Sequence, residues 1–340
     1  MRVVSLLPSA TEIVLALAGN EALRDGDGVR LVGRSHECDW PPEVLKSGVP
    51  TLTAARTRFE SSAQVDREVR AALKASGQPN GAAGAQTLYA LDVERLKSLR
   101  PDVIVTQDLC AVCSIDLSTV RAAAATMTPP PQVVSLNPET FEGMFDDILT
   151  VGEALGLGGR ATELVVQLRE RAYRVEEYVN AYTAKPRVGF LEWTDPLFVG
   201  GHWTPQLIER AGGEHPLNPT AAVEGAGAGE GPIGQTLRRA GKSTTVSDAA
   251  FAASEPEMLV ICPCGLSLDM AWRETEILSR KAWWKNLPAV QRGKVAIVDG
   301  NQYFSRPGPR LVDGLEFLVG FLNDREEIIP DGFAWKRWKA

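Results

Sequence analysis

Two cysteines that stand two residues apart, Cys110 and Cys113, have the spacing of a chemical site. They follow the apolar run VIV (103–105), which indicates a buried strand, within the segment VTQDLCAVCSID. A Cys-x-x-Cys pair at a strand end suits a redox pair, half of a zinc site, a disulfide or part of a ligand cleft. A redox pair needs a helix N-terminus or a cation to stabilise the thiolate, whereas two carboxylates, Asp108 and Asp116, flank this pair. Ligand contact, metal contact and inert packing therefore stay open as interpretations.

Two more cysteines, Cys38 and Cys264, follow the ends of other expected strands. With the pair above they would make a four-thiolate site, which suits zinc or another soft metal. Cys262 lies inside an expected strand and should face the core, and its spacing from Cys264 does not fit a second zinc knuckle. His36 and His202 each stand near an aromatic residue at a strand end and are further candidate metal ligands. A lone histidine also serves as a hydrogen-bonded structural residue, and both roles stay open.

Acidic, amide and aromatic residues also follow the expected strand ends, where parallel α/β sheets bind ligands. The candidates for ligand contact are Glu37, Trp40, Trp193, Trp203, Gln302, Tyr303 and Arg306. Aromatic planes with a few polar groups suit a large, near-neutral ligand, whereas an anionic chelate favours a cluster of arginines. Only Arg306 and Arg310 meet the second description. Glu37 and Asp39 have no nucleophile or phosphate-binding loop nearby, so we expect no enzyme.

Short apolar segments alternate with helical ones over the first 135 residues, which predicts a parallel sheet covered by helices. The expected strands are 2–7, 31–35, 103–107 and 132–137, and the expected helices include 11–18, 90–100 and 118–127. Residues 74–86 have no periodicity and indicate a surface loop.

From 138 to 183 the sequence has only helical signals, with a long helix expected within 159–183, about 36 Å at 1.5 Å per residue. After Pro186 the alternation resumes, with expected strands at 187–193, 258–264 and 294–300, helices at 204–213 and 268–279, and a loop at 221–231. We therefore expect an α/β fold of two Rossmann-like lobes with parallel sheets, joined by one long backbone helix, with a preformed ligand cleft between the lobes. The expected divisions are lobes at 1–137 and 186–320, connecting helices at 138–185 and a C-terminal tail at 321–340.

Composition limits the partners of this chain. The net charge of −7 and the pI near 5.3 argue against a nucleic-acid partner. No apolar run approaches the roughly 20 residues that cross a bilayer, so we expect no transmembrane segment. The sequence opens on a strand without a basic leader, and its five cysteines fit reduced thiols. We therefore expect a cytoplasmic monomer, or a periplasmic or extracellular protein if the start is truncated.

Several segments together resemble a known family. They are SLLPSATE, ECDWPPE, LDVERLKSLRPDVIVTQ, FLEWTDPLFVGGHWTPQLIERAGG and NQYFSRPGPR. They are similar to the cobalamin and ferric-siderophore class of ABC-transporter substrate-binding proteins, the helical-backbone metal-receptor superfamily, and most similar to its vitamin B12-binding branch. The resemblance spans nearly all of residues 1–320.

The resemblance implies a ligand and a partner. It places Glu37, Trp193, Gln302 and Arg306 in the corrinoid cleft, and Glu94 and Glu209 at the two acidic positions that engage arginines of an ABC permease. The leading hypothesis is a binding protein for cobalamin, another corrinoid or a related metal chelate. It would act as a cytosolic carrier, buffer or salvage factor, or as a transporter-type substrate-binding protein. The alternative is a cleft-cysteine metal-binding protein, or a metalloenzyme or thiol enzyme, on the same fold.

Overall fold

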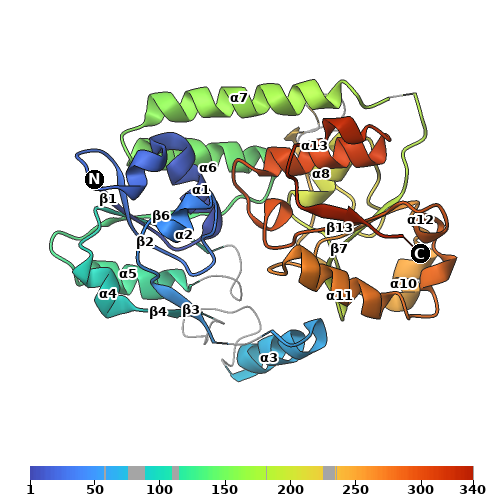
Figure 1. Cartoon of the computed structure of the whole chain (residues 1–340), viewed down its shortest axis with the longest axis horizontal. Helices are drawn as coiled ribbons and strands as arrows, with labels where there is room; N and C mark the ends of the chain where they lie inside the picture. The colour runs from blue at the N-terminus through green and yellow to red at the C-terminus, as the bar shows by residue number, and fades with distance from the viewer. Residues whose placement is uncertain are drawn as a thin grey trace. The chain divides into compact units, whose positions relative to one another are not determined.

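The chain divides into two compact units in a computed structural model that describes residues 1–56, 59–75, 89–108, 115–180, 182–224, 234 and 236–339. Unit 1 comprises Met1–Glu60, Gln64–Pro138 and Gly143–Gln167. Unit 2 comprises Ser61–Ala63, Glu139–Glu142 and Leu168–Ala340. Figure 1 traces the elements of both units along the chain.

A parallel sheet forms the centre of unit 1, as the alternation in the sequence predicts. Its described strands run in the order β2 (Arg30–Arg34), β1 (Arg2–Ser5), β5 (Val103–Gln107) and β6 (Gln132–Leu136). The helices that accompany these strands are α1 (Pro8–Ala18), η1 (Asn20–Leu23), α2 (Glu43–Lys46), α4 (Val93–Ser98) and α5 (Leu117–Ala125). Val4, Ile104 and Leu96 lie in one buried cluster, so the sheet and its helices share a core. This core fixes the strand ends that carry the candidate residues.

Unit 1 also contains a small antiparallel pair that the sequence analysis did not find. β3 (Thr53–Ala55) pairs with β4 (Tyr89–Leu91), with Thr53 opposite Leu91 and Ala55 opposite Tyr89. Three residues are too few for an alternation signal. Between these strands lies α3 (Ser62–Ala75), while most of the loop expected at 74–86 lies outside the described residues.

Two consecutive helices, α6 (Phe141–Ala154) and α7 (Gly158–Glu176), occupy the stretch that had only helical signals. Gly152 lets them approach closely, because a Cβ there would lie 2.3 Å from the Ala161 Cβ. The chain passes from unit 1 to unit 2 inside α7, between Gln167 and Leu168, so the expected helical connection is confirmed. The helix is shorter than expected: its 19 residues span about 28 Å.

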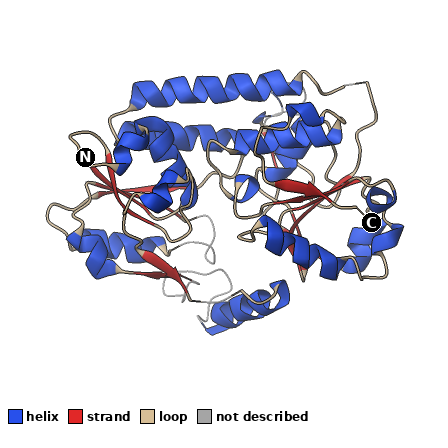
Figure 2. Ribbon diagram, viewed as in Figure 1, coloured by secondary structure: helices blue, strands red, loops and turns tan. Residues whose placement is uncertain are grey.

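A mixed sheet forms the centre of unit 2. Its described strands run in the order β11 (Thr244–Val246), β8 (Leu197–Val199), β7 (Val188–Thr194), β12 (Met258–Ile261), β13 (Val295–Val298) and β14 (Trp335–Arg337). β7, β12 and β13 are parallel to one another, as predicted, while β8, β11 and β14 are antiparallel to their neighbours. The segment expected to be a tail therefore contributes β14 to the sheet. Figure 2 shows helices beside the strands in each unit, and the α/β fold class is confirmed.

The remaining elements of unit 2 are mostly short. They are α8 (Thr204–Arg210), β9 (Ala221–Ala222), β10 (Arg238–Arg239), α10 (Asp248–Ala253), α11 (Leu268–Leu278), η2 (Trp284–Asn286), α12 (Pro288–Gln291), η3 (Tyr303–Ser305), α13 (Leu311–Leu322) and η4 (Glu326–Ile328). Of the loop expected at 221–231, the first two residues form β9 and 225–231 lie outside the described residues.

Candidate ligand-binding site

A polar cluster stands beyond the carboxyl end of β2 in unit 1. The Nδ1 atom of His36 lies 2.7 Å from Thr53 Oγ1, and the His36 amide donates to the same oxygen at 3.0 Å. The Tyr89 hydroxyl donates to Glu37 Oε1 at 2.8 Å, and the rings of Tyr89 and His36 are 5.2 Å apart. The antiparallel pair β3–β4 supplies Thr53 and Tyr89, so it fixes the orientation of both residues that follow β2.

The electrostatics of this cluster favour an uncharged His36. Burial lowers the pKa of its imidazole below the ordinary value, Arg34 lowers it further, and Glu37 opposes the shift. A neutral imidazole offers one nitrogen lone pair to a hydrogen-bond donor or a metal.

Cys38 and Trp40, the next candidates in unit 1, differ in exposure. Cys38 is fully buried in a cluster with Leu15 and Val44, and Thr11 Oγ1 donates to its sulfur at 3.0 Å. Trp40 is 40% exposed. The structure thus places the thiol in the core and the indole at the surface.

In unit 2 the end of β7 carries Trp193 beside a buried polar triad. The Trp193 Nε1 atom donates to the Ser62 carbonyl at 3.2 Å. The hydroxyls of Ser62 and Thr194 lie 2.8 Å apart, and both donate to Glu274 Oε2, at 2.5 and 2.8 Å. Because all three side chains are buried, the triad fixes the segment against which Trp193 lies.

Glu192, beside Trp193, is a partly buried carboxyl that the candidate set lacks. Its side chain accepts hydrogen bonds from Ser243 Oγ, from the Gly201 amide at 3.4 Å and from Thr204 Oγ1 at 3.4 Å. Burial raises the pKa of Glu192 to about 7, although these three donors oppose the rise. Its position at a strand end was a signal, but the sequence does not reveal the donors that converge on it.

His202 and Trp203 follow β8. His202 has a φ of 53°, in the left-handed region that costs a non-glycine residue energy, and its amide donates to the Gly241 carbonyl at 2.9 Å. Burial lowers the pKa of the His202 imidazole, Lys242 lowers it further, and Glu139 opposes the shift. Trp203 is 7% exposed, and its Nε1 donates to the Phe304 carbonyl at 2.8 Å.

The segment after β13 contains the last group of candidates. Arg310 Nη1 donates to Gln302 Oε1 at 2.5 Å, and its guanidinium lies 5.2 Å from the centre of the Tyr303 ring. Tyr303 is 5% exposed and stacks on Phe333 at 3.9 Å. Arg306 is also buried, with 4% exposure. The structure therefore brings Gln302, Tyr303 and Arg310 into one contact group.

The acidic candidates Glu94 and Glu209 have different surroundings. The Glu94 side chain is 87% exposed and forms a 3.2 Å ion pair with Lys97. Glu209 Oε1 accepts from the Thr220 amide at 3.1 Å, and Oε2 accepts from the Thr220 hydroxyl at 2.6 Å. Arg238 lies 3.6 Å from the same carboxylate. Glu209 is thus held by its own chain, whereas Glu94 projects from α4.

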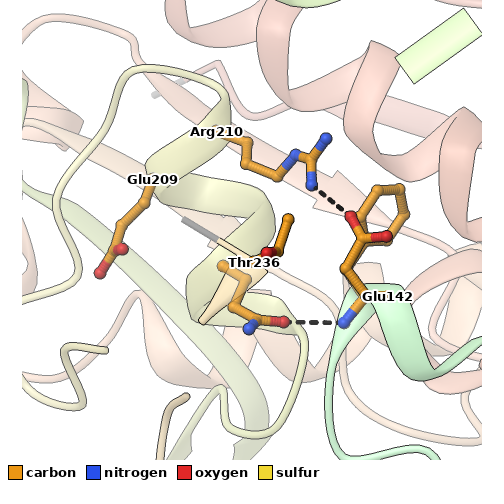
Figure 3. Close-up of a pocket in the computed structure, with 6 residues that line it drawn as sticks. Glu142, Glu209, Arg210 and Thr236 are labelled. Carbon is orange, nitrogen blue, oxygen red and sulfur yellow. Dashed lines mark hydrogen bonds and ion pairs between the residues drawn. The ribbon is translucent and has the colours of Figure 1, made fainter. Parts of the chain in front are cut away.

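Glu209 also lines a small, open pocket in unit 2. The other lining residues are Phe141, Glu142, Gln206, Arg210 and Thr236. Figure 3 shows the Arg210 guanidinium paired with Glu142. The Phe141 amide donates to Gln206 Oε1 at 2.7 Å. Of the candidate residues, only Glu209 lines this pocket, so the pocket is distinct from the strand-end candidates.

Two of the four cysteines predicted to form a thiolate site, Cys38 and Cys264, are among the described residues. Cys110 and Cys113 lie outside the described residues. Cys262 is buried, as predicted, and burial raises the pKa of its thiol well above the ordinary value. Cys264 is exposed. Among the described residues, no three histidine, cysteine, aspartate or glutamate side chains come close enough to hold a metal ion.

Both units have an α/β fold, and the described ligand candidates lie at or after the ends of their strands. The chain belongs to the periplasmic binding protein family, which matches residues 3–301. The expected class is therefore confirmed, and the chain is a substrate-binding protein and not an enzyme. No curated protein gives a significant match to the sequence.

Solved structures of binding proteins share this fold. A periplasmic haem-binding protein from Pseudomonas aeruginosa has a TM-score of 0.64 and 20% identity, over 95% of this chain and 92% of its own. A periplasmic haem-binding protein from Roseiflexus has a TM-score of 0.62 and 21% identity, over 95% and 98%. The periplasmic vitamin B12-binding protein of Vibrio cholerae has a TM-score of 0.59 and 16% identity, over 96% and 98%.

The expected cytoplasmic location is wrong. It rested on the first residues of the sequence, whereas the family and these solved structures are periplasmic binding proteins. The expected role as a cytosolic carrier, buffer or salvage factor depended on that location and is therefore withdrawn. Within the described part of the chain, no helix combines the length and apolar character that crossing a membrane requires.

Proposed function

We propose that this protein is the substrate-binding protein of an ABC importer and that its ligand is a corrinoid such as cobalamin. Membership of the family supports the binding role. The fold shared with the vitamin B12-binding protein of Vibrio cholerae is compatible with a corrinoid, and the two haem-binding proteins make iron porphyrins the main competing ligands.

The observation that carries the corrinoid proposal is that the two arginines after β13 are buried. Arg306 and Arg310 are 4% and 8% exposed, and Arg310 is engaged by Gln302 and by the Tyr303 ring. An anionic siderophore complex needs accessible guanidinium groups for charge-assisted hydrogen bonds. Exposed aromatic and amide groups instead suit a broad, near-neutral ligand.

We choose the proposed ligand contacts by the exposure of each candidate side chain. We assign contact to Glu37, Trp40, Trp193 and Gln302, whose side chains are not fully buried. Trp203 and Tyr303 are buried against Phe304 and Phe333, so we assign them a positioning role instead of direct contact. Because Arg306 is buried, contact with the ligand requires that the residues covering it move.

The proposed partner is an ABC permease that recognises acidic side chains. Glu94 is the better-placed residue, because its carboxylate is exposed and pairs at the surface with Lys97. Glu209 would have to exchange its bonds with Thr220 for those of a permease arginine.

Calorimetric titration with cyanocobalamin, ferric haem and a ferric hydroxamate siderophore tests the ligand. We expect cyanocobalamin to bind at least tenfold more tightly than the other two, a difference of about 1.4 kcal/mol. Preferential binding of haem or of the siderophore would reject the corrinoid proposal while leaving the binding role in place.

A further inference from the structure

The imidazole of His36 is held on two sides by residues from β3 and β4. Thr53 Oγ1 lies 2.7 Å from Nδ1, and the Tyr89 ring lies 5.2 Å from the imidazole. Tyr89 is in turn fixed by its hydrogen bond to Glu37. A side chain supported in this way presents its remaining atoms in a defined direction.

The remaining polar atom of the ring is Nε2. It has no hydrogen-bond partner among the described residues, and it is not among the buried unpaired atoms of that part of the chain. The residue as a whole is partly exposed. Nε2 is therefore open to a molecule that comes to this end of the sheet.

The hydroxyls behind the ring can adjust to a ligand on Nε2. Ser35 Oγ and Thr53 Oγ1 lie 3.0 Å apart, and either can be the donor. When Thr53 donates to Ser35, its oxygen can accept a hydrogen bond from Nδ1–H, and the Nε2 lone pair is then free. Metal-binding histidines usually have this arrangement, in which the second nitrogen donates to a supporting oxygen.

We propose that His36 Nε2 coordinates the metal of the bound ligand, so that the protein takes a cobalt corrinoid whose upper axial ligand is exchangeable. This inference rests on the proposed corrinoid function and goes beyond it, because it names one form of the ligand and the atom that selects it.

A metal complex fits this site better than a free ion. Within the described residues, His36 belongs to no group of three metal-ligating side chains. A single imidazole holds a metal firmly only when a macrocycle supplies the other ligands. A hexadentate siderophore leaves no position for the nitrogen, whereas a corrinoid that carries water on its upper face does.

The binding step is a ligand substitution. The Nε2 lone pair forms a bond to Co(III), the bond between cobalt and water breaks, and water leaves. The imidazole keeps its proton on Nδ1, and this N–H donates a hydrogen bond to Thr53 Oγ1. The step therefore changes neither the oxidation state of cobalt nor the number of bound protons.

Absorption spectroscopy and calorimetry with two cobalamins test the proposal. Aquocobalamin carries an exchangeable water, and cyanocobalamin carries a cyanide that imidazole does not readily displace. We expect the wild-type protein to shift the visible bands of aquocobalamin to longer wavelength. We also expect the wild type to bind aquocobalamin more tightly than cyanocobalamin, by about tenfold or more, with cyanocobalamin unshifted.

Two variants test whether the spectral shift and the higher affinity for aquocobalamin arise at His36. His36→Ala should abolish the shift and lower the affinity for aquocobalamin to that for cyanocobalamin, whose own affinity should change little. Thr53→Val removes the oxygen that supports Nδ1 but leaves Nε2 in place. It should retain the shift and weaken aquocobalamin binding by about tenfold.

The outcomes separate this inference from the proposed function. If cyanocobalamin binds but aquocobalamin shows no shift, or if the shift persists in His36→Ala and disappears in His202→Ala, the assignment to His36 is overturned and the corrinoid function stands. If neither cobalamin binds, the proposed function fails and the inference fails with it.

Discussion

Trp193 is the residue whose replacement most directly tests the ligand site. Trp193 lies at the end of β7, and its Nε1 donates to the Ser62 carbonyl, which orients the ring. Trp193→Ala should remove a stacking surface worth about 1 kcal/mol and weaken cyanocobalamin binding several-fold by calorimetry. Trp193→Phe keeps an aromatic face without the N–H donor and should lose less affinity. Equal losses in the two variants would mean that the hydrogen bond, and not the ring face, matters.

Asp147 on α6 should make stability depend on pH. Burial raises the pKa of Asp147 from the ordinary 3.8 to about 7, and neighbouring Asp146 adds to the rise. The folded protein therefore holds a proton that the unfolded chain has lost, so the contribution of Asp147 to the unfolding free energy falls as the pH rises from about 4 to 7. Its Oδ2 atom is buried and has no hydrogen-bond partner in the described part of the chain.

Asp147→Asn should remove this dependence, because the amide carries no charge at any pH. In urea denaturation the variant should exceed the wild type by about 1–3 kcal/mol at pH 8 and by much less at pH 5. Asp146→Asn changes the exposed neighbour and is the matched control, with a small effect at both pH values. An Asp147→Asn effect of equal size at pH 5 and pH 8 would contradict the assignment.

At the scale of elements, the C-terminal half of α7 is fixed to unit 2 by two ionic networks. Arg171 pairs with Asp313 and Glu316 on α13, at 2.6 and 2.5 Å. Arg210 on α8 pairs with Glu176 at 2.6 Å and with Glu142 at 2.9 Å. The Arg210 guanidinium also lies 4.8 Å from the centre of the Phe141 ring.

Arg210 and Arg169 offer a matched comparison, because both contact Glu142. The Arg210 side chain is 8% exposed, whereas the Arg169 side chain is 44% exposed and lies 3.3 Å from Glu142. Arg210→Met removes the buried cation that Glu176 and Glu142 share, and leaves Glu142 with the more exposed Arg169. It should cost about 3 kcal/mol in urea denaturation. Arg169→Met should cost less than about 1 kcal/mol. Similar costs for both would show that burial does not strengthen the Arg210 network.

The sequence predicted the elements whose signals are local. β1, β5, β7, β12 and β13 are apolar runs, and α4 and α5 begin at aspartate N-caps. β3, β11 and β14 have three residues each and pair with strands that are distant in the sequence, as Val298 does with Trp335. The sequence analysis did not identify α13, although most of its residues are buried in the structure.

The candidate site, too, was predictable from the sequence only where local signals were enough. Strand ends located Glu37, Trp193 and Gln302, because the end of a parallel strand is a local property of the sequence. Whether a side chain at such a position turns inward depends on residues far along the chain. Trp203 is buried by its bond to Phe304, and Tyr303 by stacking on Phe333, and neither partner is marked in the sequence.

At the scale of the whole molecule, import requires both ligand binding and recognition by a permease, and Glu94 allows the two to be separated. Its carboxylate is 87% exposed on α4. Uptake of labelled cobalamin by cells that lack the native protein reports the complete process, whereas calorimetry on the purified protein reports ligand binding alone.

Glu94→Lys should place a like charge opposite a permease arginine, so uptake should fall by about tenfold or more while calorimetric affinity for cyanocobalamin stays unchanged. Glu163→Lys changes an exposed carboxylate on α7 by the same two charges and is the control, with uptake near the wild-type level. Glu209→Ala should lower both uptake and stability, because the carboxylate also holds Thr220. Because Glu94→Lys breaks only a surface pair, normal uptake by this variant would exclude Glu94 from the permease contact, and a parallel loss of affinity would move it to the ligand site.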